Sequence, residues 1–169
     1  MTEKKKRKTG IIWMILVLIW MGVIFSFSAR EADESTAMSH SVGKEIGRIF
    51  IPEFGSWSGE KQEQFAERID FPVRKCAHAS EYAVLGVLLL GTAYSFSKGW
   101  ERKIWISSWC IGTVYAATDE FHQLFVPGRS CQIRDVCIDS AGVMAGILLF
   151  SLIKHKIEKR KRKKRTCKN

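Results

Sequence analysis

The sequence lacks the features that usually mark a soluble metal-binding protein or a repeat protein. Its five cysteines contain no CxxC pair and no spacing typical of a zinc site, and the chain has neither an internal repeat nor a low-complexity linker. Residues 10–27 carry no charged side chain at all. A soluble globular fold would have to account for that run, whereas about 20 apolar residues cross the hydrocarbon core of a bilayer. These absences favour a membrane protein made of a single domain over 1–169.

Apolar segments are present where charge is scarce, and four of them are predicted to be transmembrane helices. They lie at about 10–28, 73–96, 103–124 and 133–153. The first reaches spanning length on uncharged residues, and the other three reach it when the polar turn at one end is included. The predicted fold class is therefore all-α, an integral membrane bundle of four transmembrane helices. Residues 29–72 form a predicted external helical loop, and 154–169 form a basic tail.

The net charge of +10 is concentrated beside the apolar segments. Basic residues precede the first span, follow the last one, and outnumber acids in the connection that contains Lys98. Such residues mark the cytoplasmic side of a membrane, so the distribution predicts a multi-pass protein of the cell membrane with both termini cytoplasmic. It argues against nucleic acid as a partner and favours membrane lipids. Cleavage of the first span as a signal peptide is an alternative, because small residues follow it.

The loop 29–72 is predicted to contain two helices. Val42, Ile46, Ile49 and Phe50 share one helical face. A second, short helix is expected to begin near Ser58 and to end before Pro72. Neither apolar stripe is large enough for an independent core, so both helices are expected to lie on the membrane surface or to cover the spans.

Ionisable residues cluster at one end of each of the last three spans. Because consecutive spans run in opposite directions, clusters at a start, an end and a start meet at one membrane face. A charge at the centre of a span costs roughly 2.5–3.5 kcal/mol on insertion scales and indicates function. The sequence therefore predicts a polar pocket that is open to the outer face. The clusters contain Lys75, His78 and Glu81, then Asp119, Glu120 and His122, then Asp135 and Asp139.

Histidine beside carboxylates is typical of general acid–base chemistry, and an arginine fits a phosphate or carboxylate. A turn at Pro127–Gly128 is expected to hold Arg129 over the cluster. Three interpretations remain open: a structural network, a substrate or headgroup site without metal, and a metal site built on two pairs of His and carboxylate. The candidate catalytic residues are His78, Glu81, Asp119, His122 and Asp135. The candidate substrate-binding residues are Lys75, Tyr82, Glu120, Gln123, Arg129 and Asp139.

The combined pattern resembles the VanZ-like family of bacterial membrane proteins over nearly the whole chain. The motifs that carry the resemblance are Lys75-x-x-His78-x-x-Glu81-Tyr82-x-x-Leu85-Gly86, Asp119-Glu120-Phe121-His122-Gln123-x-Phe125-x-Pro127-Gly128-Arg129 and Asp135-x-x-x-Asp139-x-x-Gly142. The resemblance implies a cell-envelope context and an association with low-level resistance to the glycopeptide teicoplanin. It implies no biochemical mechanism, no cofactor and no oligomeric state.

Two functions of different classes follow. The first is an enzyme of the outer leaflet that acts on an anionic or lipid-linked envelope precursor, with Arg129 and Lys75 binding the anion and a histidine moving a proton. The second is a non-enzymatic module that binds a lipid headgroup, an antibiotic or a partner protein, with a purely structural polar cluster.

Overall fold

The structure is a computed structural model that describes residues 3–97 and 100–166. Lys98 and the end of the basic tail, 167–169, lie outside the described residues. The described chain is all-helical and contains no strand, which confirms the predicted fold class at this level. Its helices are α1 (Glu3–Ser28), α2 (Ala32–Phe50), the short 3₁₀ helix η1 (Phe54–Ser56), α3 (Gly59–Phe96), α4 (Arg102–Gln123) and α5 (Ile133–Thr166).

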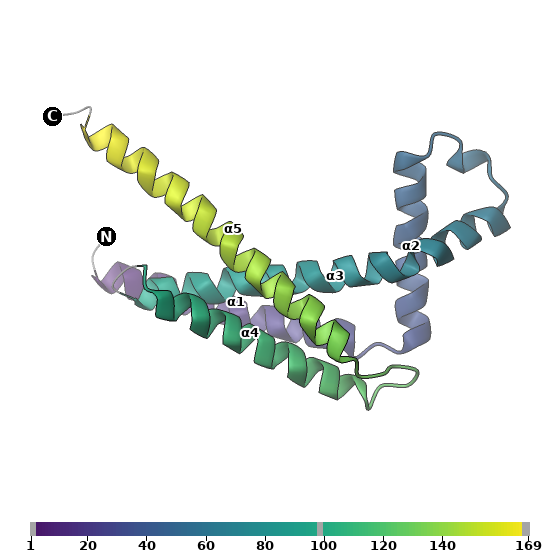
Figure 1. Cartoon of the computed structure of the whole chain (residues 1–169), viewed down its shortest axis with the longest axis horizontal. Helices are drawn as coiled ribbons and strands as arrows, with labels where there is room; N and C mark the ends of the chain where they lie inside the picture. Colours follow the sequence, from purple (N-terminus) through teal and green to yellow (C-terminus); the bar gives the residue numbers. More distant parts are fainter. Residues whose placement is uncertain (1–2, 98–99, 167–169) are drawn as a thin grey trace.

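Helices α1, α3 and α4 run side by side, and α5 crosses them at an angle (Figure 1). The start of α1 and the end of α5 lie at the same end of this bundle, and α2 lies across its opposite end (Figure 1). Three helical segments are long and apolar enough to cross a membrane: Glu3–Ser28, Gly59–Phe96 and Ile133–Lys161. Helix α4 is not among them, so the prediction of four spans is supported for three.

Glycines allow α3 and α5 to pack with their backbones in contact. A Cβ on Gly146 would lie 1.8 Å from the carbonyl oxygen of Ala83, and one on Gly142 would lie 2.4 Å from that of Ala79. In the reciprocal contact, a Cβ on Gly86 would lie 2.2 Å from the carbonyl oxygen of Val143. Small residues at these positions give the close helix contact that is typical of membrane bundles. The core around this contact includes Val17, Ile24, Tyr82, Leu85, Leu90, Val143 and Ile147.

The prediction of a short loop helix that ends before Pro72 was wrong. A helix does begin after Ser58, whose side chain accepts a hydrogen bond from the Lys61 N–H, but it runs through Pro72 without interruption to Phe96. Proline removes one helical hydrogen bond and usually bends the helix. Here the flanking Asp70 pairs with Arg74 and also accepts a hydrogen bond from Ser39 of α2. These contacts hold both sides of the proline in one helix.

Helix α2 forms as predicted, but its apolar stripe does not make the packing contact. Val42, Ile49 and Phe50 are exposed, with 50%, 73% and 76% of their surface accessible. The buried residues of α2 are Ser39, Gly43 and Gly47. A Cβ on Gly43 would lie 3.3 Å from the Cα of Ala66 in α3. Small residues occupy the contact because they let two helix backbones approach closely. Val42 and Ile46 line a cavity beside that contact, and Ile49 and Phe50 are left on the outside.

Candidate functional site

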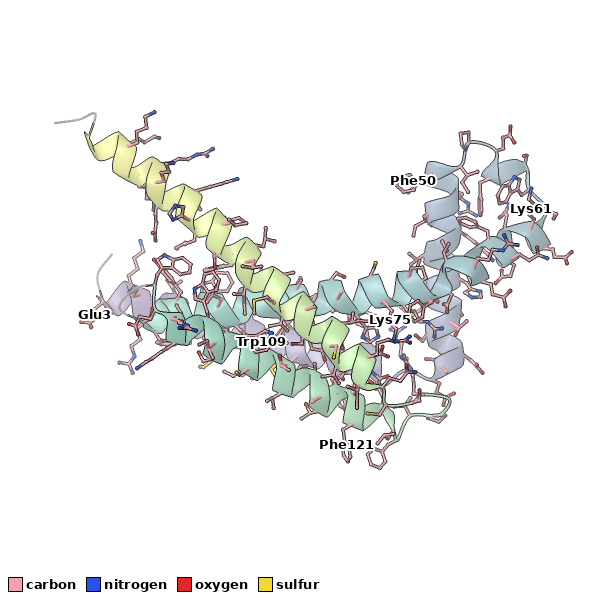
Figure 2. The ribbon with its side chains drawn as sticks, in the orientation of Figure 1. Glu3, Phe50, Lys61, Lys75, Trp109 and Phe121 are labelled. Carbon is pink, nitrogen blue, oxygen red and sulfur yellow. The ribbon has the colours of Figure 1, made fainter. Side chains whose placement is uncertain are left out.

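The predicted polar clusters do converge at one end of the bundle, beside α2. Lys75 of α3 and Phe121 of α4 both lie toward this end, away from Glu3 (Figure 2). Lys75 pairs with Asp135 of α5, with 2.6 Å between Nζ and Oδ2. These contacts follow from the alternating direction of the helices, as the start–end–start placement predicted.

One turn farther along the same helices, His78 faces Asp139. Its Nδ1 lies 4.0 Å from Oδ1 of Asp139. Asp139 is 1% exposed, and neither of these atoms makes a well-formed hydrogen bond with the described part of the chain. The imidazole of His78 is therefore the polar group that lies opposite the buried carboxylate of Asp139.

Asp119 lies among residues of two other helices and of its own helix, α4. It is buried and sits beside the hydroxyls of Ser28 in α1 and Tyr82 in α3, and beside Gln123. Neither of its carboxylate oxygens makes a well-formed hydrogen bond with the described residues. Burying a carboxylate in a membrane costs free energy unless water or a ligand forms hydrogen bonds with it.

Glu120 and Gln123, two candidate substrate-binding residues, belong to a buried network. The Gln123 side chain donates to Oε1 of Glu120 at 3.1 Å. The backbone N–H of Gln132 donates to Oε2 at 3.0 Å. Glu120 therefore fixes the connection into α5, one residue before that helix begins. His122 contacts α1, with its ring centroid 4.4 Å from that of Phe25.

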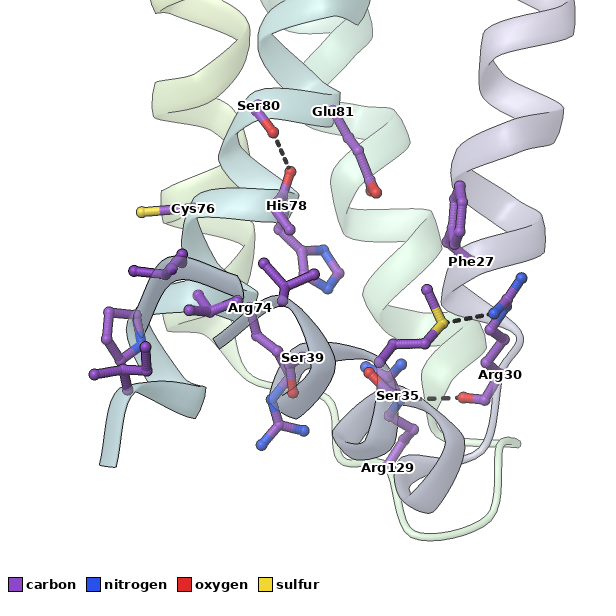
Figure 3. A pocket seen from close by; sticks show the side chains of 17 residues that line it. Phe27, Arg30, Ser35, Ser39, Arg74, Cys76, His78, Ser80, Glu81 and Arg129 are labelled. Atoms are coloured by element: carbon purple, nitrogen blue, oxygen red, sulfur yellow. Dashed lines mark hydrogen bonds between the residues drawn. The ribbon is translucent and has the colours of Figure 1, made fainter. Parts of the chain in front are cut away.

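A cavity of about 720 Å³ lies between the end of α1, α2 and α3. His78 and Glu81 project from α3 toward this space, and Phe27 and Arg30 border it from the side of α1 (Figure 3). This volume is within the usual range of small-molecule pockets. Most of the wall is apolar, formed by side chains that include Met38, Val42, Ile46, Ile69, Pro72 and Val73.

Three arginines line the same cavity: Arg30, Arg74 and Arg129. The Nε of Arg129 donates to the backbone carbonyl of Arg30 at 3.3 Å, and Arg129 forms no ion pair with the described residues. Burial, followed by the nearby Arg74 guanidinium, lowers the pKa of Arg129 from its usual value. Its two terminal amino groups make no hydrogen bond with the described residues, so they stay available for an anion.

Sequence reasoning missed Arg74 and Arg30 as members of this site. Arg74 lies next to Lys75, which the motif includes, and Arg30 lies in the connection after α1. Their convergence depends on α2 packing across α3, which no local pattern encodes. The helix that continues through Pro72 places Arg74 beside α2. Sequence reasoning ended that helix before Pro72 and therefore did not place Arg74 there.

The His, Asp and Glu side chains of the site are not arranged as metal ligands. Within 3–97 and 100–166, no group of three or more His, Cys, Asp or Glu side chains is placed to hold a metal ion. The arrangement brings together cations that fit an anion, apolar walls that fit a hydrocarbon chain, and a histidine backed by a carboxylate.

In a comparison with protein families, the VanZ/LLP1 family model matches residues 13–154. No curated protein and no solved structure matches the chain.

Proposed function

This chain belongs to the VanZ/LLP1 family, and on that premise we propose that it is a multi-pass protein of the cell membrane that binds an anionic, lipid-linked component of the envelope. The cavity between α2 and α3 is the binding site. The observation that carries the proposal is the grouping of three arginines at a cavity whose remaining wall is mostly apolar.

The connectivity supports four membrane crossings. Helix α3 ends at the end of the bundle where α1 starts, and α5 starts at the opposite end (Figure 1). If α3 and α5 both cross the bilayer, α4 must carry the chain back across it. The uncharged run 104–118 of α4 is short for a span. Burial of its polar end against α3 and α5 compensates, because Asp119, Glu120 and Gln123 are buried there.

The orientation follows from the basic ends. Both the start of α1 and the end of α5 carry lysines and arginines, and these residues stay in the cytoplasm. The cavity lies at the opposite end of the bundle, so it opens at the outer face. Helix α2 then lies along the membrane surface, with its exposed apolar side chains in contact with lipid.

The ligand chemistry follows from the two parts of the cavity. Guanidinium groups bind phosphate through paired N–H donors, and a hydrocarbon chain gains about 0.8 kcal/mol for each CH₂ that it buries. A phosphate-bearing lipid places its headgroup at Arg129 and Arg74 and its chain along α2 and α3. Arg129 contributes most, because it pairs with no acid among the described residues. Arg74 and Lys75 contribute less, because Asp70 and Asp135 already pair with them.

Binding of dodecyl phosphate to the purified full-length protein tests the proposal. Native mass spectrometry is expected to show one retained dodecyl phosphate, and neither dodecanol nor inorganic phosphate alone is expected to bind as tightly. Arg129→Gln should weaken binding by about tenfold or more, since a charge-assisted contact contributes roughly 1.5–3 kcal/mol. Arg74 is left unchanged in this test because its pair with Asp70 holds α3 together across Pro72. Arg48→Gln is the matched control, because Arg48 is exposed on α2 and pairs with Glu45. Equal binding by both variants would overturn the arginine site.

A lipoglycopeptide such as teicoplanin is the second candidate ligand, because its acyl chain fits the same apolar wall. In that case the protein acts by binding alone, and the polar cluster beneath the cavity is structural. Competition between teicoplanin and dodecyl phosphate separates the candidates. Displacement of dodecyl phosphate by teicoplanin at comparable concentration supports the antibiotic, and no displacement supports the envelope lipid.

A further inference from the structure

The pair His78–Asp139 lies at the base of the arginine-lined cavity. His78 lines the cavity, while its Nδ1 is buried and faces Asp139 at 4.0 Å. The other ring nitrogen, Nε2, is therefore the one that can meet a ligand. The distance is longer than a hydrogen bond, as contacts between catalytic groups often are before a substrate binds.

The spacing of this pair is fixed by backbone packing. Asp139 precedes Gly142 by three residues, and His78 precedes Ala79 by one. The Gly142–Ala79 contact brings the two backbones together next to the pair. A carboxylate held in this way behind an imidazole orients the ring and stabilises its protonated form.

The charges around His78 complete the arrangement. Arg74 and Arg129 line the same cavity as His78. A phosphate held by these arginines would thus share that cavity with the imidazole. Glu81 lines the same cavity one helical turn after His78, so a second proton-transferring group lies on the same helix face.

Resting on the anion site proposed above, we propose that this cavity hydrolyses the phosphate monoester of a lipid, with His78 as general base and Asp139 as its positioning residue. His78 Nε2 takes a proton from water as the water oxygen forms a bond to phosphorus. The bond between phosphorus and the lipid oxygen breaks, and its electron pair stays on that oxygen. Glu81 protonates the lipid oxygen, so the products are a lipid alcohol and inorganic phosphate.

Two groups are needed because attack and departure occur on opposite sides of phosphorus. Arg129 and Arg74 stabilise the charge on the transferred group and need no change of protonation. The proton on His78 then returns to Glu81 through water, which restores both residues. The proposed reaction consumes water alone and needs no oxidant or reductant.

Release of inorganic phosphate from dodecyl phosphate by the full-length protein in detergent micelles tests the reaction. His78→Gln should lower kcat by about 10²–10⁴-fold and leave binding of dodecyl phosphate unchanged. Asp139→Asn should lower kcat by about tenfold or more with KM unchanged, because it acts only through the imidazole. His155→Gln is the matched control and should behave as wild type, since His155 lies on the basic part of α5.

Chemical rescue distinguishes catalysis from a structural role. In His78→Ala, added imidazole should restore part of the phosphate release, whereas it should not change His155→Gln. Protein that binds dodecyl phosphate but releases no phosphate refutes the hydrolysis and leaves the binding function intact. Protein that does not bind it refutes the binding function itself. A folded His78→Ala variant with wild-type turnover, or one that imidazole does not rescue, refutes the role of His78.

Discussion

At the scale of single residues, the sequence predicted which groups meet but not how they pair. Lys75, His78 and Asp135 converge because alternating helices bring one end of each span to the same face. Arg129, which the turn was expected to hold over the cluster, pairs with none of the cluster's acids in the part of the chain that the structure describes. Glu120 and Asp135 have other partners, since hydrogen bonds in a buried network depend on side-chain positions that spacing alone does not determine.

Arg129 is predicted to recognise its ligand through the shape of its guanidinium as well as through charge. Arg129→Lys keeps the charge but loses the paired donors, so it should weaken dodecyl phosphate binding by about tenfold. Because Arg129 pairs with no described acid, the amount of protein in the membrane should not change. Native mass spectrometry and quantitative blotting of membranes measure the two quantities. An unchanged affinity, or loss of the protein from the membrane, would show that Arg129 is structural.

At the scale of helices, small residues decide the packing that hydrophobic patterns could not. The Gly142-x-x-x-Gly146 spacing was visible in the sequence, and the structure places both glycines against α3. The apolar stripe of α2 does not make the close contact with α3, and part of it lines the cavity instead, because in a membrane protein a large apolar side chain gains as much from lipid as from a core. Hydrophobic periodicity therefore finds the helix but not its packing face.

Gly146 is predicted to be essential for the contact between α3 and α5. Gly146→Ala places a Cβ 1.8 Å from a backbone oxygen, so the helices must separate, and the free energy of unfolding should fall by about 1–3 kcal/mol. Gly22→Ala is the control, because nothing lies within 4 Å of its Cβ position. It should change stability by less than about 1 kcal/mol. Unfolding in a detergent mixture compares the two variants, and equal stability would contradict the packing.

Helix α2 is also attached to α3 by an exposed ion cluster that should respond to pH. Glu63 of α3 lies 2.6 Å from Nδ1 of His40 and 2.5 Å from Nζ of Lys44, both on α2. Hydrogen bonds from Lys44 and then His40 lower the pKa of Glu63 below its usual 4.5. A lowered carboxyl pKa means that the contribution is fully present above about pH 4.5. It is lost as the pH falls through the lowered value.

Hydrogen exchange of α2, corrected for intrinsic rates, measures this contribution. Protection should fall a few-fold between pH 6 and pH 3, as is typical of an exposed ion cluster. Glu63→Gln should lower protection at pH 6 and abolish the change with pH. Glu67→Gln, one helical turn farther along α3, should retain it. A pH response that survives in Glu63→Gln would assign the effect to another group.

At the scale of the whole molecule, the all-helical fold, the family and three of the spans were predictable from the sequence. Length of apolar run and distribution of basic residues are properties of the chain itself. The cavity was not predictable, because its walls come from three helices that are distant in sequence. The two arginines that sequence reasoning missed also lie in different segments: Arg30 precedes α2, and Arg74 follows Pro72. Such a site exists only after the helices have packed.

The orientation of the molecule is predicted to place Ser58 outside the membrane and Lys161 inside. On a cysteine-free background, an impermeant thiol reagent added to intact cells should label Ser58→Cys and leave Lys161→Cys unlabelled until the membrane is opened. The crossing by α4 has its own pair of positions, Glu101 and Ser130, which are exposed and flank that helix. Ser130→Cys should react from outside and Glu101→Cys should not. Reaction of both from one side would mean that α4 does not cross the membrane. Reaction of Lys161→Cys alone from outside would turn the arginine-lined cavity toward the cytoplasm, where an outer-leaflet lipid could not enter it.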